Sequence, residues 1–300
     1  MGDARRQVFR DVIEDTEKIT RRHGPPAPAA HKSYGVRTGP GRKRQDNMDQ
    51  FLEGTTALVT GGGTGIGRAS ALALAAAGCT VTVAGRTVAT LEETVRLIID
   101  AGGAARHVEC DVGDEQSVAH AVQVAVGDFG RLDFGVNSAG ISGGDDLRKT
   151  ADYPVETFDR MIAIDLRGTF LSMKYQLRQM QAQGFGSIVN VGSGASVVGV
   201  AGFAGYTAAK HGVIGLTRTA ALDYGPDGIR VNALVVGLVN TPLIAEGRSP
   251  EVMAARVAAH PIGRIAEPEE IADAVLWLCS DRSSFVTGAA LPVDGGYTAR

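Results

Sequence analysis

The sequence TALVTGGGTGIG runs from Thr56 to Gly67 and is followed by an alanine-rich segment with helical spacing. Its first five residues predict a buried strand. Gly61 then permits a tight turn, Gly65 lets the backbone approach a bound phosphate, and Gly67 lets the following helix pack on the strand. The free N–H groups at a helix N-terminus favour an anion such as a pyrophosphate. We therefore predict a dinucleotide-binding loop that includes Gly61, Thr64, Gly65, Ile66 and Gly67.

Beyond this loop, short β-branched runs alternate with helical segments. The predicted strands are Thr56–Thr60, Thr80–Ala84, Arg106–Asp111, Leu132–Asn137, Ser187–Val191, Arg230–Val235 and Ala290–Val293. The predicted helices are Gly65–Ala77, Ala89–Ala101, Glu115–Phe129, Pro154–Gln183, Ala204–Tyr224 and Pro268–Ser280. Apolar strands separated by helices indicate a parallel sheet covered on both faces. The expected fold class is α/β: a single doubly wound Rossmann domain with a central parallel sheet of about seven strands.

The first 47 residues differ from the rest in composition. They contain Gly24-Pro25-Pro26-Ala27-Pro28 and Arg42-Lys43-Arg44. Eleven basic and six acidic side chains give this segment a net charge of +5, which leaves −8 for the remainder. We predict a flexible N-terminal extension over residues 1–47 and the Rossmann domain over residues 48–300. The alternative is that the extension is a basic arm that contacts a partner.

Composition and charge argue against several classes of function. Hydrophobic residues make up 44% and charged residues 21%, with a net charge of −3, so neither a nucleic-acid nor a membrane partner is predicted. No apolar stretch reaches the roughly 18 residues of a membrane span. Three isolated cysteines, Cys79, Cys110 and Cys279, indicate buried free thiols and a cytoplasmic protein. The six histidines lack metal-ligand spacing, so no metal site is predicted.

The residues that follow the second, third and fourth strands are candidates for cofactor contacts. An NAD-selective site usually carries an acid after the second strand, but this sequence has Gly85-Arg86, and Arg86 suits a 2′-phosphate. NADP(H) is therefore favoured, NAD(H) remains possible, and the alternative for Arg86 is an ordinary surface arginine. Further predicted contacts at the carboxyl ends of these strands are Asp111, Val112, Asn137, Ala139 and Gly140.

Tyr206 and Lys210 are four residues apart on a predicted helix and therefore share one face. A neighbouring ammonium favours the ionised form of a tyrosine, which then exchanges a proton with a substrate oxygen near neutral pH. Ser193 lies in a turn after the fifth strand, from where its hydroxyl would reach the same oxygen. The flanks of Ser193, Val191-Gly192 and Gly194-Ala195, do not form the nucleophile elbow of a hydrolase.

The order and separation of these motifs resemble the short-chain dehydrogenase/reductase family. The resemblance covers about Leu52 to the C-terminus, including the closing Asp294-Gly295-Gly296. It implies an oxidoreductase that transfers hydride between a nicotinamide dinucleotide and a carbonyl or alcohol substrate. It also implies Tyr206 as general acid/base and as a cofactor contact, Lys210 as ribose ligand and Ser193 as substrate-oxygen ligand. Cofactor contacts from Val239 and Thr241 and a variable substrate loop from Leu238 to about Ile265 are implied as well. A homotetramer is implied as well, with the helices Pro154–Gln183 and Ala204–Tyr224 packing across one interface.

The sequence departs from the family where an asparagine normally helps to hold a water that relays protons to the lysine. Here Ile164-Asp165-Leu166 places Asp165 at that position. An aspartate still binds water, but its negative charge opposes ionisation of Tyr206. We therefore include Asp165 among the catalytic candidates and expect activity with a shifted pH optimum. Ser138 and Val236 are milder departures, at positions that usually hold asparagine and proline.

Two other functions remain open on the sequence alone. One is a non-catalytic dinucleotide-binding sensor or scaffold, supported only by Asp165 and the basic extension. The other is a lyase or epimerase that returns its cofactor unchanged. The substrate is predicted to be a small-molecule carbonyl or alcohol. Its identity and the physiological direction of the reaction are not determined by the sequence.

Overall fold

The computed structural model describes residues 51–142, 147–245 and 250–299. Within these ranges, seven parallel strands form one sheet in the order β3-β2-β1-β4-β5-β6-β7. The strands are β1 Thr56–Thr60, β2 Thr80–Gly85, β3 Ala104–Glu109, β4 Phe134–Asn137, β5 Gly186–Val191, β6 Ile229–Val236 and β7 Ala290–Val293. Residues 1–47, for which an extension is predicted, lie outside the described ranges.

The strand order reverses between β1 and β4. From β1 the chain winds outward to β2 and β3, and it then returns to β4 on the other side of β1. Thr60 at the end of β1 pairs in register with both Ala84 of β2 and Asn137 of β4. Such a reversal opens a crevice at the carboxyl ends of the strands, which is where doubly wound sheets bind ligands. The predicted fold class is confirmed.

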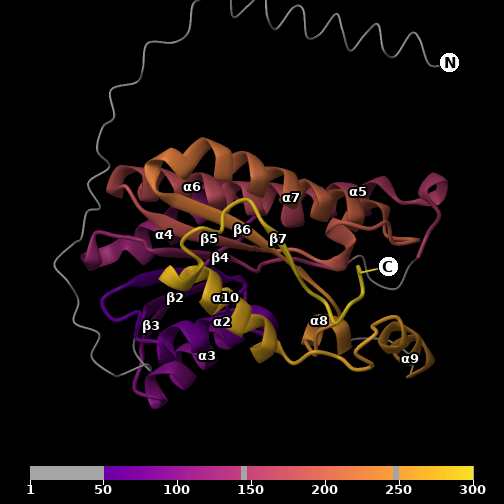
Figure 1. Ribbon diagram of the computed structural model, residues 1–300, viewed down its shortest axis with the longest axis horizontal. Helices are drawn as coiled ribbons and strands as arrows, with labels where there is room; N and C mark the ends of the chain where they lie inside the picture. The colour runs from indigo at the N-terminus through magenta and orange to yellow at the C-terminus, as the bar shows by residue number, and fades with distance from the viewer. Residues whose placement is uncertain (1–50, 143–146, 246–249, 300) are drawn as a thin grey trace, which may run out of the picture. The chain divides into compact units, whose positions relative to one another are not determined.

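Helices cover both faces of the sheet (Figure 1). On one face lie α2 Gly65–Ala76, α3 Val88–Asp100 and α10 Pro268–Cys279. On the other lie α4 Glu115–Val126, α6 Gly168–Gln183 and α7 Ala204–Tyr224. Successive residues of a strand point to opposite faces, so Leu58 packs toward the second set of helices and Val59 toward the first. Both faces are therefore apolar, as predicted from the uninterrupted runs.

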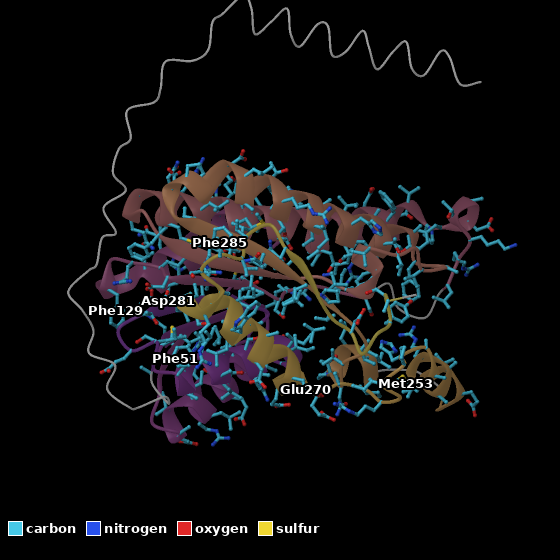
Figure 2. All side chains as sticks on the ribbon, viewed as in Figure 1. Phe51, Phe129, Met253, Glu270, Asp281 and Phe285 are labelled. Carbon is cyan, nitrogen blue, oxygen red and sulfur yellow. The ribbon has the colours of Figure 1, made fainter. Side chains whose placement is uncertain are left out.

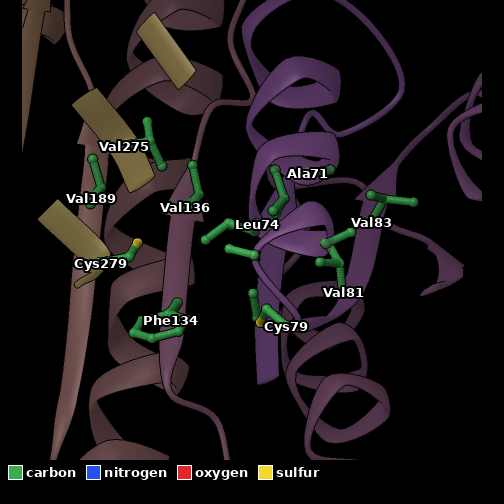
Figure 3. Packing of buried hydrophobic residues seen from close by; sticks show 14 of the residues in the cluster. Ala71, Leu74, Cys79, Val81, Val83, Phe134, Val136, Val189, Val275 and Cys279 are labelled. Atoms are coloured by element: carbon green, nitrogen blue, oxygen red, sulfur yellow. The ribbon is translucent and has the colours of Figure 1, made fainter. Parts of the chain in front are cut away.

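The core between α2, α10 and the sheet is built from small and medium side chains (Figure 3). Ala71 and Leu74 of α2 pack with Val136 of β4 and Val275 of α10 in one buried cluster. The alanines on α2 let this helix approach the sheet closely. That approach fixes the position of the N-terminus of α2 at the switch point, where the glycine loop precedes it.

The predicted helix Pro154–Gln183 is present, but it is not a regular α-helix in its middle. It consists of α5 Val155–Met161, a π-helical turn η3 over Ile162–Arg167, and α6. A π turn inserts one extra residue into the helical ladder. The insertion is invisible in the sequence because apolar residues continue across it. Its consequence is local: Asp165, within η3, is fully buried.

After β6 the chain leaves the sheet and forms two short helices. These are α8 Pro242–Ala245 and α9 Pro250–Ala258, which lie beyond the sheet on the side where β6 ends (Figure 1). Figure 2 marks Met253 on α9 and Glu270 on α10. Short helical turns complete the chain: η1 Gly127–Phe129, η2 Thr150–Asp152, η4 Gly194–Ser196, η5 Gly225–Asp227 and η6 Asp281–Ser283. Among the described helices, none has the length and apolar character needed to cross a membrane.

Candidate active site

The glycine loop joins β1 to α2 with very little free space. Gly61 and Gly65 have positive φ angles of 69° and 51°, which side chains rarely adopt. A Cβ on Gly67 would lie 2.2 Å from the carbonyl oxygen of Gly61. Thr64 precedes α2 and, within the described chain, its side chain does not cap the helix. The first-turn amides of α2 are therefore available to an anion, as the sequence predicts.

An open cavity extends from the glycine loop across the ends of β2, β3 and β4. Seven of the predicted cofactor residues line it: Gly61, Thr64, Arg86, Asp111, Val112, Ala139 and Gly140. A Cβ on Gly61 would lie 2.8 Å from the amide nitrogen of Ala139, so the floor of the cavity is bare backbone. A cradle of backbone amides with one arginine at its rim fits a dinucleotide that carries phosphates.

Glycines on α7 allow close contact with the helices that carry Asp165. A Cβ on Gly205 would lie 3.1 Å from Cα of Phe158, and one on Gly212 would lie 2.7 Å from Cδ1 of Leu166. Between these glycines, the Lys210 ammonium lies 5.6 Å from the centre of the Tyr206 ring. The predicted pairing of Tyr206 with Lys210 on one helix face is therefore present in the structure.

Lys210 and Asp165 form a buried ion pair. The Nζ atom of Lys210 lies 3.3 Å from Oδ1 of Asp165, and it also donates to the carbonyl oxygen of Val191 at 3.4 Å. Oδ1 of Asp165 accepts from the backbone amide of Ile141 at 3.2 Å. Oδ2 of Asp165 is buried and, among the described residues, has no hydrogen-bond partner. An unpartnered carboxylate oxygen next to a buried ammonium is suited to hold a water molecule.

Burial and pairing act in opposite directions on these two groups. Burial raises the pKa of the Asp165 carboxyl, and the Lys210 ammonium only partly offsets this. Burial alone would lower the pKa of Lys210. The charges of Asp165 and Tyr206 outweigh that effect, so the pKa of Lys210 is raised from its ordinary value of 10.5. Lys210 is accordingly an ammonium throughout the neutral range.

Ser193 is held by a reciprocal pair of hydrogen bonds at the end of β5. Its hydroxyl accepts from the amide of Ala195 at 3.2 Å, and its own amide donates to the hydroxyl of Ser196 at 3.0 Å. These bonds fix the Ser193 side chain while leaving its O–H proton to donate. The geometry is compatible with the predicted contact to a substrate oxygen.

The structure places four further predicted cofactor residues next to the glycine loop or in the core. Thr241 lies directly above the glycine loop, since a Cβ on Gly65 would come within 2.9 Å of its Cγ2. The side chains of Ile66 and Val239 pack into the core. Asn137 is not among the residues that line the cavity. Its amide group instead bonds to Gln176 and Asn190 at 2.8–3.1 Å in a buried network.

Several residues that line the cavity were missed from the sequence. These are Gly63, Gly85, Thr87, Thr90, Leu91, Cys110, Ile141 and Ile164. Gly85, Cys110 and Ile141 directly adjoin predicted contacts, so their position near a strand end was an available signal. Thr90 and Leu91 on α3, and Ile164 in the π turn, reach the cavity only through tertiary packing.

Comparison with known proteins agrees with this architecture. The family model described as enoyl-(acyl carrier protein) reductase matches residues 61–298. Cyclohexanol dehydrogenase from Acinetobacter sp. (strain SE19) is 40% identical over 253 residues, covering 84% of this chain and 98% of the relative. Cis-4-hydroxycyclohexanecarboxylate dehydrogenase from Sinomonas cyclohexanicum is 46% identical over 252 residues, covering 84% and 100%.

Solved structures give the same result. A crystal structure of levodione reductase superposes with a TM-score of 0.79 at 35% identity, covering 82% of this chain and 98% of that one. A protein from Agrobacterium tumefaciens, described as a candidate 2-deoxy-D-gluconate 3-dehydrogenase with bound NADP, superposes with a TM-score of 0.77 at 34% identity. The match covers 85% of this chain and 100% of that one.

The chain belongs to the short-chain dehydrogenase/reductase family. It is an NAD(P)-dependent oxidoreductase that acts on the CH–OH or C=O group of a small molecule. The comparisons lend no support to the sensor or scaffold alternative.

Proposed function

We propose that this enzyme interconverts a cyclic secondary alcohol and its ketone, with Tyr206 as the general acid/base. The observation that carries the proposal is the placement of Tyr206 beside Lys210, whose ammonium pairs with Asp165 and lies next to Gly140 in the wall of the cofactor cavity. Each role given to a residue below follows from that placement and from the chemistry of its side chain.

When bound, the nicotinamide supplies or accepts the hydride. In the oxidation direction, Oη of Tyr206 takes the proton of the substrate hydroxyl, and Ser193 donates a hydrogen bond to the same oxygen. The Lys210 ammonium stabilises the phenolate form of Tyr206 that accepts this proton. Asp165 holds Lys210 in place, and its unpartnered Oδ2 is the atom at which a relay water would bind. In the reduction direction, Tyr206 returns the proton to the carbonyl oxygen.

The substrate class is inferred from the relatives and from the substrate loop. Two relatives are named for cyclohexane rings that bear a hydroxyl group. In this chain, exposed apolar side chains follow β6, including Leu243 on α8, Val252 on α9, and Ile262. An apolar wall suits a saturated ring better than a polyhydroxylated sugar.

For the cofactor, we propose a preference for NADP(H) over NAD(H). Arg86 lines the cavity at the end of β2, where NAD-selective sites usually carry an acid. Asp111 is the only acidic side chain among the residues that line this cavity in the described chain, and it lies at the end of β3. The rim next to Arg86 is therefore free of a carboxylate that would repel a 2′-phosphate.

The proposal is tested by turnover with cyclohexanol and 4-hydroxycyclohexanecarboxylate, followed through nicotinamide absorbance, with 2-octanol as an open-chain comparison. Tyr206→Phe is expected to lower kcat by about 10²- to 10⁴-fold while cofactor affinity stays near that of the wild type. Tyr175→Phe, which removes a hydroxyl bonded to Glu115 on the outside of α6, is the matched control. Equal turnover by Tyr206→Phe would refute the role of Tyr206. Absence of any net change in absorbance would favour the lyase or epimerase alternative.

We also propose a homotetramer, with α5, α6 and α7 packing across one interface. Exposed apolar side chains on these helices support this: Val155, Phe158, Phe170 and Leu222. Light scattering tests the assembly, and a monomeric mass would refute it. A cytoplasmic location is proposed from the cysteines, since Cys79, Cys110 and Cys279 are all free and buried.

A further inference from the structure

His260 lies at the junction of three segments that are distant in the sequence. It lies two residues after the end of α9, and it is 8% exposed. Its imidazole contacts the loop after β6 and the C-terminal turn that begins at Asp294. None of the sequence motifs singled out this residue, because it has no periodic or spacing signal.

Both ring nitrogens of His260 are engaged. Nε2 accepts from the backbone amide of Leu238 at 3.0 Å, and Nδ1 lies 2.8 Å from the carbonyl oxygen of Arg256. An amide only donates and a carbonyl only accepts, so the pair of bonds requires a neutral ring with its proton on Nδ1. One side chain thus joins the last turn of α9 to the loop that carries Val239 and Thr241.

The surroundings leave the ring no alternative position. The Tyr297 ring stacks on it with centres 4.9 Å apart and planes 23° apart. A Cβ on Gly237 would lie 2.9 Å from Nε2 of His260 and 2.8 Å from Cα of Asp294. The carboxylate of Asp294 is itself fixed by the amides of Gly296 and Thr298 at 2.9 and 2.8 Å. The imidazole is therefore clamped between the loop and the C-terminal turn.

From α9, contacts continue to the catalytic tyrosine. The Arg256 guanidinium lies 5.9 Å from the centre of the Phe203 ring. Phe203 meets Tyr206 edge to face, with ring centres 6.3 Å apart and planes at 64°. Arg256 therefore links the two sets of contacts. Its backbone carbonyl bonds to His260, and its side chain lies over the Phe203 ring beside Tyr206.

We propose that His260 is a positioning residue that fixes the predicted cofactor-binding loop of Val239 and Thr241 and the helix α9 relative to each other. Through Leu238 it sets the loop of Val239 and Thr241, and through Arg256 it sets the wall of the substrate site next to Tyr206. The expected effect on the alcohol KM rests on the proposed function. The expected effect on the cofactor Kd concerns binding alone.

Three variants separate the two bonds. His260→Gln retains an acceptor near the position of Nε2, His260→Asn retains a donor near the position of Nδ1, and His260→Phe retains only the ring. His120→Phe, an exposed histidine on α4, is the matched control. The readouts are the Kd of NADPH from nicotinamide fluorescence, the KM for a cyclic alcohol, kcat, and thermal unfolding of each purified protein.

His260→Phe is expected to raise both the cofactor Kd and the alcohol KM by about three- to tenfold, the range for one lost hydrogen bond, with a smaller change in kcat. His260→Gln should recover the cofactor Kd, and His260→Asn the alcohol KM. Unchanged constants in all folded variants would overturn the proposal, as would an equal loss in all three without partial recovery. If His260→Phe does not fold, the proposal is still decided by comparing the cofactor Kd and the alcohol KM of His260→Gln with those of His260→Asn. A wild type without turnover on cyclic alcohols would sink the proposed function, while the Kd measurements would still test His260.

Discussion

The ammonium of Lys210 lies 3.3 Å from Oδ1 of Asp165, and both groups are almost completely buried. A buried ion pair is weak evidence for stability, because desolvation of both charges opposes their attraction. Its clearer consequence here is chemical. The pair holds a charged Lys210 beside the Tyr206 ring, so the ionisation of Lys210 is expected to limit the pH range of the proposed acid/base step.

Asp165→Asn is expected to move the alkaline limb of the pH profile of kcat/KM to lower pH. Without the carboxylate, burial is expected to dominate and the pKa of Lys210 to fall, because the charge of Asp165 is the largest effect that offsets desolvation in the native protein. Activity at the alkaline end should therefore fall, because the proposed step requires a charged Lys210. Rates from pH 5 to 11 test this, with the exposed Asp223→Asn as control, and superimposable profiles would refute it.

The same pair makes stability dependent on pH. The raised pKa of Lys210 means that its contribution to stability is complete below the ordinary value of 10.5 and is lost as pH rises through the folded-state value. In Asp165→Asn the folded-state pKa of Lys210 is expected to fall below 10.5, so an uncharged lysine then favours the native state at high pH. The wild type should therefore lose thermal stability above pH 10.5 more steeply than the variant, as measured by unfolding at pH 8 to 11.

Gly140→Ala is expected to disrupt the ion pair sterically. A Cβ at this position would lie 2.5 Å from Oδ1 of Asp165 and 3.5 Å from Nζ of Lys210. Because Asp165 is buried, it has little room to move, and we expect kcat/KM to fall by about tenfold or more as the site shifts. Gly225→Ala, where no atom lies within 4 Å of the added Cβ, is the control. Wild-type kinetics in Gly140→Ala would show that the pair is not needed in this geometry.

Arg86→Ala is expected to alter the choice of cofactor. Loss of a charge-assisted contact to a phosphate corresponds to about 1.5–3 kcal/mol, or roughly 10- to 150-fold in the Kd of NADPH. The Kd of NADH should change little, since it carries no 2′-phosphate. Fluorescence titrations with both cofactors measure the two constants. No change in either constant would mean that Arg86 is an ordinary surface arginine, and a parallel change in both would show that it does not recognise the 2′-phosphate.

Thr217→Val is expected to destabilise the fold through a buried polar network. The Thr217 hydroxyl accepts from Nδ2 of Asn190 at 2.9 Å and donates to the carbonyl oxygen of Val213 at 2.8 Å. Valine has nearly the same shape but leaves the buried Asn190 amide without that acceptor, at a cost of about 1–3 kcal/mol. Urea unfolding gives the difference. Thr219→Val, on the exposed side of the same helix, is the control, and equal stability of the two variants would contradict the argument.

The sequence determined the fold class and indicated most of the candidate cofactor site because both depend on local patterns. Apolar strand runs, helical periodicity and the glycine loop between Gly61 and Gly67 are each contained within about a dozen residues. Since parallel strands place their carboxyl ends at one edge, Arg86, Asp111 and Gly140 could be assigned to that edge without coordinates. Tyr206 and Lys210 shared a face because four residues make about one helical turn.

Only the tertiary structure decided which side chains interact across those elements. The π turn at Asp165 leaves no periodic signal, and its ion pair with Lys210 depends on the close packing of α7 allowed by Gly205 and Gly212. Asn137 looked like a cofactor contact because of where its strand ends, but its amide bonds to Gln176 and Asn190. His260 gave no signal at all. A hydrogen bond or a steric fit is set within a few tenths of an ångström between segments far apart in the chain, whereas sequence patterns report only on neighbours along it.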